Sequence, residues 1–435
     1  MTNYRINVST VAAQYLCNSC GACFAICANG SVRYSETVGG YLFPQIDQRT
    51  CIHCGLCYDV CPGINFGKTL TTRMPEDPFA GNVLSCEIGR CTDDAIFSNS
   101  QSGGVTTALL IHLFETIQIE AAVVAIMQTG ALPRGDVLLV KSTSELMRAQ
   151  KSKYTPIPLL KVIQDIKKIQ GPVALVGLPC HMHGLHNLTD MNPDLAKKQF
   201  FKIGLICDRI MTTAAINFMS NRATHEPISD FVFRDKLFPS YPGSPVVKKA
   251  SGEKVVLKAS FRIAIKDFFT PVRCRLCFDK LNVFADVVLG DPHGVNDADK
   301  IGGETLVFSR NEKGQQLIRE AKLSGFVTLR ECDWNVAITG QGVDKKRKEW
   351  AGFMRAWEEM GKQLPRYPYI QITCAPVQNH KKMLMDALSL DKNTREAVLN
   401  AAGWWLLRRK FYNFILWFID KSKTFTRNIL NMSKR

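Results

Sequence analysis

A cysteine motif that occurs twice within the first 61 residues constrains this chain more than any other feature. Both copies have the spacing C-x2-C-x2-C-x3-C. The first copy is Cys17, Cys20, Cys23 and Cys27, and the second is Cys51, Cys54, Cys57 and Cys61. Three thiols spaced this closely on one loop can reach three corners of a cubane iron–sulfur cluster, and the fourth ligand comes from elsewhere. The repeat therefore predicts two [4Fe–4S] clusters.

The fourth ligand of each cluster is expected to come from the other copy of the motif. In two-cluster ferredoxins the last cysteine of each run ligates the other cluster. The expected ligand sets are Cys17, Cys20, Cys23 and Cys61 for one cluster, and Cys51, Cys54, Cys57 and Cys27 for the other. Gly21 and Gly55 allow the backbone to wrap closely around sulfur. The alternative is that these cysteines bind zinc or have no common role, and the repeated spacing makes it less favourable.

Composition narrows the class of protein. The chain has 435 residues, of which 46% are hydrophobic, so two or three cores are expected. Its sixteen cysteines follow no recognisable export leader, which favours metal binding in a reducing cytoplasm over disulfides. The net charge of +16 is partly concentrated in residues 401–435, and no nucleic-acid-binding motif accompanies it. No apolar run approaches the about 20 residues needed to span a bilayer.

The fold class expected is α+β, in four segments. They are a ferredoxin-like domain with two clusters at 1–70, a linker leading into the next domain at 71–94, an α/β domain at 95–350 and a helical region at 351–435. Helical patterns alternate with short apolar runs in the third segment, which is typical of a sheet covered by helices. The expected helices include 105–117 and 159–169, and the expected strands are 121–126, 137–140, 173–176, 203–206 and 285–289.

Four further cysteines are candidates for a third cluster. They are Cys180, Cys207, Cys274 and Cys277. Cys180 and Cys207 each follow a predicted strand, and strand ends of an open α/β sheet converge on one edge. The spacing alone leaves two alternatives open, because a zinc site or a bare CxxC with two structural cysteines fits it as well.

A second candidate site begins at Ser102-Gly103-Gly104-Val105, where a helix is predicted to start. Free backbone N–H groups at a helix start bind anions, and glycines allow a phosphate to approach closely. The plainer alternative is a serine N-cap with a flexible turn. The segment 151–154 (KSKY) could grip a phosphate or be a solvated loop.

These segments together resemble the family of coenzyme F420 hydrogenase/dehydrogenase beta subunits over nearly all of residues 15–325. The resemblance is carried by SQSGGVTTALL at 100–110, KSKY at 151–154, VALVGLPC at 173–180, IGLIC at 203–207, CRLCFDK at 274–280 and ADVVLGD at 285–291. It implies a flavin, normally FAD, in the central α/β domain beside a third [4Fe–4S] cluster. It maps Ser102, Gly103 and Gly104, with Val105 beginning the helix, and also Lys153 and Tyr154, onto flavin contacts.

The function implied is that of a flavin-dependent iron–sulfur oxidoreductase. Single electrons from a ferredoxin-like donor or a partner redox subunit would enter through the N-terminal clusters, reach FAD and leave as hydride. Many bacterial members of the family lie in polysaccharide gene neighbourhoods, so a small-molecule or glycan-related substrate is expected. The alternative is an electron-transfer subunit without its own substrate. His181, His183 and Asp291 are expected near the site, and the catalytic residues stay unknown.

The remaining features are peripheral to this chemistry. Residues 403–419 place aromatic and apolar side chains on one helical face flanked by basic residues, which suits peripheral contact with an anionic membrane or docking on protein. The leftover cysteines are expected to be small buried hydrophobes. They are Cys86, Cys91, Cys332 and Cys374.

Overall fold

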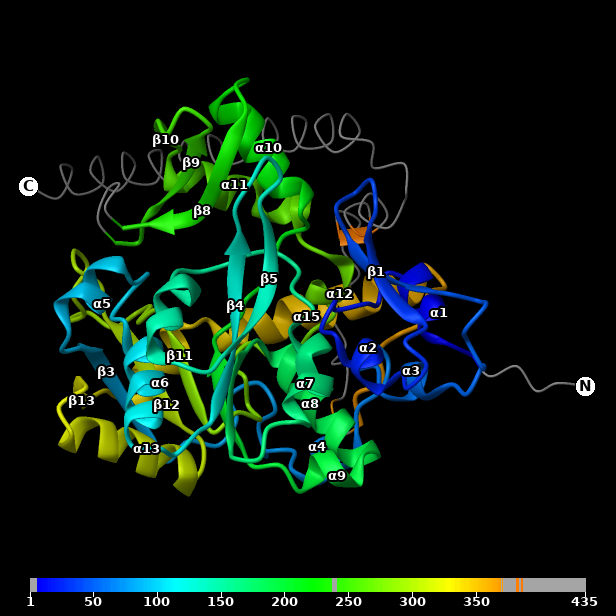
Figure 1. The fold of residues 1–435 in the computed structure, drawn as a ribbon, viewed down its shortest axis with the longest axis horizontal. Coiled ribbons are helices and arrows are strands. Elements are labelled where there is room, and N and C mark those ends of the chain that lie inside the picture. Colours follow the sequence, from blue (N-terminus) through cyan, green and yellow to red (C-terminus); the bar gives the residue numbers. More distant parts are fainter. Residues whose placement is uncertain (1–5, 237–240, 369, 371–380, 383–384, 386–435) are drawn as a thin grey trace, which may run out of the picture.

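The computed structural model describes residues 6–236, 241–368, 370, 381–382 and 385 (Figure 1). Its N-terminal part consists of helices α1 (Val8–Ala13), α2 (Ala22–Ile26) and α3 (Leu56–Asp59) and strands β1 (Val32–Glu36) and β2 (Leu42–Ile46). The strands pair as an antiparallel hairpin between the two cysteine runs. Helices α2 and α3 begin after Gly21 and Gly55, whose positive φ angles of 100° and 81° let the loop turn sharply into a helix.

An eight-stranded mixed sheet forms the centre of the chain. Its order is β13-β3-β12-β11-β7-β6-β4-β5. The strands are β3 (Ser85–Cys91), β4 (Ala121–Gln128), β5 (Arg134–Val140), β6 (Val173–Gly177), β7 (Phe200–Leu205), β11 (Val287–Gly290), β12 (Thr305–Ser309) and β13 (Val327–Glu331). Strands β4, β6, β7 and β11 run parallel to one another. The central strand β6 is buried along its whole length, which explains its uninterrupted apolar sequence.

Helices cover both faces of this sheet. Those of the large domain are α4 (Lys68–Thr72), α5 (Asp94–Asn99), α6 (Val105–Glu115), α7 (Ile163–Ile166), α8 (Pro179–Met191), α9 (Pro193–Ala196), α13 (Glu312–Leu323), α14 (Trp334–Gly340) and α15 (Val343–Glu359), with 3₁₀ helices η1 (Thr143–Ala149) and η2 (Leu159–Val162). Along β4, Ala122 and Val124 belong to the core shared with α6 and α13, whereas Ala121 and Val123 belong to the core shared with η2 and α8. Successive residues of a strand point to opposite faces, so one strand serves both cores.

A smaller layer lies above the end of this sheet in Figure 1. It consists of strands β8 (Ile228–Asp235), β9 (Ser244–Lys249) and β10 (Lys254–Val256) with helices α10 (Ala214–Ala223) and α11 (Ala259–Phe269). The short helix α12 (Val272–Arg275) follows α11 and packs near α15, in the core shared with the cysteine-rich part. The core of the smaller layer contains Phe231, Phe233, Phe268 and Phe269. This aromatic core separates it from the two cores of the large sheet.

The cysteine-rich part is attached to the large domain through buried polar contacts. The N–H of Leu160 in η2 donates to the carbonyl of Cys20 at 2.9 Å, and the side chain of Asn187 in α8 donates to the carbonyl of Val60 at 3.0 Å. Arg273 donates to the carbonyls of Pro62 and Gly63 at 3.0 and 2.9 Å. The cysteine loops are therefore held against η2, α8 and α12.

The structure agrees with the expected strands and corrects several boundaries. All five expected runs form strands, although the run at 203–206 begins earlier, at Phe200. The segment 71–94 is not purely a linker, because β3 within it pairs with β12 and β13 in the large sheet. The expected helix at 159–169 is shorter and splits into η2 and α7, and the layer formed by β8 to β10 was not expected.

Most of the region expected to be helical at 351–435 lies outside the described residues, and so does the amphipathic segment 403–419. Helix α15 covers its first nine positions and ends at Glu359. Among the helices that the structure describes, none combines the length and the apolar character required to cross a membrane.

Candidate functional site

The structure gathers the eight N-terminal cysteines into two groups that exchange their last members. The thiols that interact with Cys17 and Cys20 include Cys61, whereas those that interact with Cys57 are Cys27, Cys54 and Cys51. Burial raises the pKa of Cys17, Cys20 and Cys23, and the neighbouring thiols raise it further. Each group thus joins the residues that we expected to share a cluster. Four converging thiols held protonated by burial suit a cationic iron core, which would stabilise their thiolate forms.

Backbone N–H groups point at these sulfur atoms. The N–H of Ser19 lies 3.2 Å from the Sγ of Cys17, that of Ser31 lies 3.3 Å from Cys27, and that of Val8 lies 3.4 Å from Cys57. Hydrogen bonds to cluster sulfur are among the factors that set a cluster's reduction potential. The second group lies nearer the surface, since Cys54 is exposed whereas Cys17, Cys20, Cys23 and Cys61 are buried.

The four candidate cysteines of the central domain also converge. Cys180 lies in the first turn of α8, Cys207 follows β7 by two residues, Cys274 lies in α12 and Cys277 follows it. The pKa of Cys180 is raised by burial and then by Cys20, Cys207, Cys274 and Cys277. Three distant segments therefore bring four thiols to one place, as the strand-end argument predicts.

The three thiol groups form a series. Cys57 of the surface group interacts with Cys23 of the buried group, and Cys20 of the buried group interacts with Cys180. Helix α8 approaches the buried group closely at Gly184, where an added Cβ would lie 3.3 Å from the Sγ of Cys20. This arrangement leads from the surface through the N-terminal loops to the edge of the large sheet.

The described cysteines are neither paired in disulfides nor close enough together to share a single metal ion. Every cysteine of the described residues is free. No set of three or more His, Cys, Asp or Glu side chains in this part of the chain is arranged to hold one metal ion. Ligands of a single zinc ion lie about 2.3 Å from it and therefore close together, whereas a cubane spreads its four ligands apart.

The SGG segment is tightly packed, and its polar groups already form hydrogen bonds within the protein. The N–H of Gly103 donates to Thr305 Oγ1 at 3.1 Å, and the Ser102 hydroxyl donates to the carbonyl of Glu304. An added Cβ at Gly103 would lie 2.4 Å from the carbonyl oxygen of Gly89, so only glycine fits there. Gly104 has φ 75° and caps α6. The free donor that we expected at Gly103 is therefore already engaged, because β12 packs directly against the loop.

Lys153 and Tyr154 have different surroundings. The Lys153 ammonium donates to the carbonyls of Gln150 and Lys151 at 2.7 and 2.9 Å, and burial lowers its pKa to about 7. The Tyr154 hydroxyl accepts a hydrogen bond from Arg234 Nη1 at 3.0 Å. The same Arg234 atom donates to Asp291 at 2.7 Å. Lys153 thus stabilises its own loop, whereas Tyr154 and Asp291 both accept hydrogen bonds from Arg234.

The structure adds basic residues that we did not single out from the sequence. Arg234 is 4% exposed and Arg262 is 8% exposed, and in each a guanidinium nitrogen is buried without a hydrogen-bond partner among the described residues. Lys236 donates to the carbonyl of Ser102 at 3.0 Å, which ties the end of β8 to the SGG segment. Burial lowers the pKa of Lys236 to about 8. Single basic residues at a strand end carry no sequence signal.

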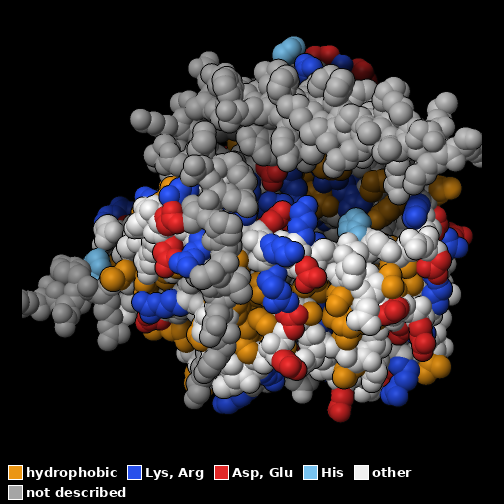
Figure 2. Space-filling model, turned by 180° about the vertical axis from the view of Figure 1, so that it is seen from behind, with side chains coloured by type: hydrophobic (Ala, Val, Ile, Leu, Met, Phe, Trp, Pro, Cys, Tyr) orange, Lys and Arg blue, Asp and Glu red, His pale blue; other side chains and the backbone are white. Residues whose placement is uncertain are grey.

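These residues form what we call the basic cluster. It comprises Tyr154, Arg234, Lys236, Arg262 and Asp291. Buried cationic donors that lack partners are costly unless an anion satisfies them. The unpartnered nitrogens of Arg234 and Arg262 therefore suit the phosphates of a cofactor. On the face seen from behind, Lys and Arg side chains lie interspersed with Asp and Glu side chains near the middle (Figure 2).

The two histidines expected near the site have different roles. His181 accepts from the N–H of Leu178 at 3.1 Å and lies 3.1 Å from the carbonyl of Ile157, and burial lowers its pKa to about 4. It is therefore a neutral residue that caps the start of α8. His183 pairs with Asp279 at 3.0 Å, and both are buried. Asp279 follows Cys277 by two residues and His181 directly follows Cys180, so both histidines lie beside residues of the third thiol group.

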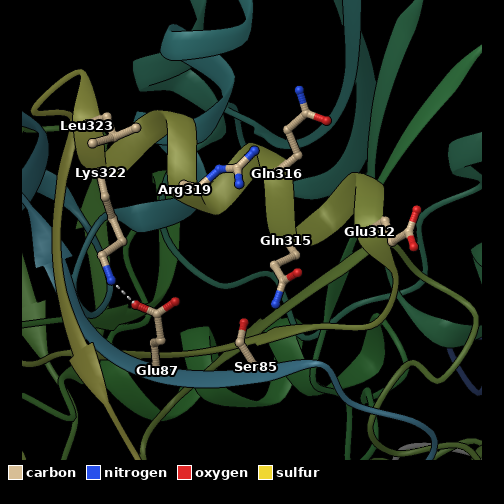
Figure 3. Close-up of a pocket in the computed structure, with 8 residues that line it drawn as sticks. All are labelled: Ser85, Glu87, Glu312, Gln315, Gln316, Arg319, Lys322 and Leu323. Carbon is tan, nitrogen blue, oxygen red and sulfur yellow. Dashed lines mark hydrogen bonds and ion pairs between the residues drawn. The ribbon is translucent and has the colours of Figure 1, made fainter.

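Other candidate features lie apart from these sites. Cys86 and Cys91 are buried as expected, Cys332 is half-buried beside Cys86, and Cys374 lies outside the described residues. A surface hollow of about 700 Å³ lies between β3 and α13 (Figure 3). Polar side chains line it, including the ion pair of Lys322 with Glu87. None of the candidate cofactor residues lines this hollow.

The fold and the thiol groups define an iron–sulfur electron-transfer protein, and comparison with known proteins specifies the family. Residues 88–164 and 171–334 match the N-terminal and C-terminal models of the coenzyme F420 hydrogenase/dehydrogenase beta subunit. Residues 16–63 match the 4Fe-4S dicluster domain. The chain belongs to the family of coenzyme F420 hydrogenase/dehydrogenase beta subunits, as its sequence motifs predict.

Two relatives and one solved structure are representative. A subunit of the F(420)H(2) dehydrogenase of Methanosarcina mazei is 24% identical over 78% of this chain and 92% of its own length. The coenzyme F420-dependent sulfite reductase of Methanocaldococcus jannaschii is 24% identical over 76% of this chain and 50% of its own length. A chain of the F420-reducing [NiFe] hydrogenase complex from Methanosarcina barkeri has a TM-score of 0.53 at 19% identity and covers 68% of this chain and 100% of its own. At this level of identity, the similarity to the hydrogenase chain shows a shared fold.

Proposed function

We propose that this protein is an iron–sulfur flavoprotein oxidoreductase that collects single electrons and delivers them as hydride to a substrate. The observation that carries the proposal is the series of three thiol groups in a chain that also holds the basic cluster. Two groups match the ligand spacing of [4Fe–4S] clusters, and the third would hold another through Cys180, Cys207, Cys274 and Cys277. The family relationship supports an oxidoreductase.

The residues of the chain would contribute binding and positioning. The exposed Cys54 places the surface group where a ferredoxin-like donor or a partner redox subunit can reach it. Arg234 and Arg262 supply buried positive charge for a phosphate of FAD, and Tyr154 and Asp291 orient the Arg234 guanidinium. FAD, when bound, supplies the conversion between one-electron and two-electron chemistry. The tight packing around the SGG segment would help to exclude water from the proposed flavin site.

The test is anaerobic purification of the full chain, with iron, sulfide and flavin counted per chain. We expect about twelve irons and one FAD, and a reductive titration in which cluster and flavin absorbance bleach together. Replacing Arg234 by methionine should lower flavin retention at least tenfold and leave iron unchanged. Arg222, a basic residue in the last turn of α10, provides the matched control variant Arg222→Met. Full iron without any flavin would refute the flavoprotein proposal.

The alternative is an electron-transfer subunit without its own substrate. The names of the relatives favour it, because two of the proteins described above are a dehydrogenase subunit and a hydrogenase complex. Steady turnover of an electron acceptor by the isolated flavin-loaded chain would favour the enzyme. Activity that appears only after a partner subunit is added would favour the relay. A glycan-related small molecule is the substrate class that we propose to screen first, with coenzyme F420 as the comparison.

A further inference from the structure

Two cysteines outside the three thiol groups lie directly opposite each other on neighbouring strands. Cys86 belongs to β3, and Cys332 directly follows β13, which is an edge strand of the large sheet. The antiparallel register pairs Glu87 with Glu331, so the next pair along the two strands is Cys86 with Cys332. The N–H of Cys332 donates to the carbonyl of Cys86 at 3.0 Å, so the pairing continues to this position.

This placement meets the geometric requirement of a disulfide. Directly opposed residues of a hydrogen-bonded antiparallel pair have Cα atoms about 5.5 Å apart and side chains on the same face. A disulfide joins residues whose Cα atoms lie about 4.4–6.8 Å apart. The thiols of Cys86 and Cys332 also interact with each other, and Cys332 packs against the apolar core that contains Cys86. The two sulfur atoms can therefore bond without a rearrangement of the strands.

The two thiols are free in this structure and differ in access. Cys86 is 9% exposed, because β3 lies between β12 and β13. Cys332 is half-buried at the edge of the sheet, between the exposed residues Glu331 and Asp333. Burial raises the pKa of both thiols, so they are protonated at neutral pH and react slowly. A reagent from solvent would therefore meet Cys332 first.

We propose that Cys86 and Cys332 form a reversible disulfide that fastens the edge strand β13 to β3 when the protein meets a low-molecular-weight disulfide. The Cys332 sulfur attacks one sulfur of the reagent, whose S–S bond breaks and releases one thiol. The Cys86 sulfur then attacks the mixed disulfide at Cys332 and releases the second thiol. The two cysteines lose two electrons and two protons, and the two released thiols carry both. No cluster or flavin takes part, so the proposal stands apart from the proposed function.

The bond would lie where the chain passes from β13 into α14. Trp334 begins α14, and its ring packs edge-on against that of Phe308 in β12, with the centroids 4.8 Å apart. Gln341 follows the other end of α14, and its side chain donates to the carbonyl of Asp291 at 2.7 Å. Asp291 belongs to the basic cluster. The disulfide would therefore fix one end of a helix whose other end contacts that cluster.

The test is peptide mapping of the full anaerobic chain after exposure to 2-hydroxyethyl disulfide, with the remaining thiols alkylated before digestion. Trypsin leaves Cys86 and Cys332 as the single cysteines of the peptides 74–90 and 331–345, so their disulfide gives one linked mass. We expect at least tenfold more of this linked peptide than of any link to Cys91, and its loss after dithiothreitol. Cys91 is the matched internal control, because it lies in the same strand, is 2% exposed and pairs with Val327.

Hydrogen exchange tests whether the bond fastens the edge strand. In the oxidised wild type we expect the amides of residues 327–332 to exchange at least threefold more slowly than in Cys332→Ser treated in the same way. If Cys332→Ser does not fold, the wild type before and after dithiothreitol gives the same comparison. Absence of the linked peptide, an equal yield of links from Cys86 or Cys332 to other cysteines, or unchanged exchange in the linked protein would each overturn the proposal.

Discussion

Replacing Gly21 by alanine tests how the cysteine-rich part is attached to the large domain. Gly21 has φ 100°, and an added Cβ would lie 2.7 Å from the Lys161 nitrogen and 2.8 Å from the Leu160 nitrogen. These are backbone atoms of η2, which cannot move as a flexible side chain would. The substitution therefore combines left-handed backbone strain with a clash at the contact surface.

The magnitude follows from these two contributions. A non-glycine residue in the left-handed region costs about 1–2 kcal/mol, and overpacking of a tight contact costs about 1–3 kcal/mol. We expect Gly21→Ala to lower the free energy of unfolding by about 2–5 kcal/mol. Gly30 is the matched control, because it has φ 62° and nothing within 4 Å of an added Cβ. Gly30→Ala should show the strain contribution alone, about 1–2 kcal/mol.

The assay is anaerobic urea unfolding of the cluster-loaded chain, followed by the visible absorbance of the clusters and by far-ultraviolet circular dichroism. Limited proteolysis between residues 71 and 84 provides a second measurement, since loosened attachment should expose this segment. Equal losses in Gly21→Ala and Gly30→Ala would show that the contact with η2 contributes nothing beyond backbone strain, and the reasoning would be wrong.

Two further predictions concern the third thiol group and a buried histidine. Cys207→Ala should lower the iron count from about twelve to about eight per chain and leave the N-terminal clusters intact, and an unchanged count would contradict a third cluster. Burial lowers the pKa of His186 from its ordinary 6.5 to about 3, so below pH 6.5 the unfolded chain takes up a proton that the folded chain does not, and stability falls. Between about pH 6.5 and 5 this loss of stability is about 2 kcal/mol, and His186→Asn should remove it. Urea midpoints that fall equally in the wild type and the variant would show that His186 does not cause the pH dependence.

The sequence predicted the grouping of the cysteine thiols better than it predicted the residues around them. The spacing of the N-terminal cysteines reflects the size of a cubane, so the motif carries its geometry within a few residues. The convergence of Cys180 and Cys207 followed from the rule that parallel strand ends share an edge. The strands at 121–126 and 173–176 were predictable because burial on both faces makes them continuously apolar.

The sequence could not predict features that depend on the tertiary structure. Arg234 and Arg262 become a site only because the layer formed by β8 to β10 brings them to Tyr154 and Asp291. The engagement of the Gly103 N–H depends on Thr305, which is 202 residues away. Strand β3 was overlooked because its sequence SCEIGRC is short and contains two charged residues and a glycine, although its register with β12 and β13 is regular.

The hydrogen bonds from Leu160, Asn187 and Arg273 to the N-terminal loops have a kinetic consequence. A tethered carrier has to diffuse between a position where it accepts an electron and one where it gives the electron away. Here the loops are fastened at three places, so the gap from Cys20 to Cys180 is set by the fold. Under the proposed function, electron transfer between these two thiol groups should be insensitive to solvent viscosity and to ionic strength, and only the encounter with the external donor should respond to them.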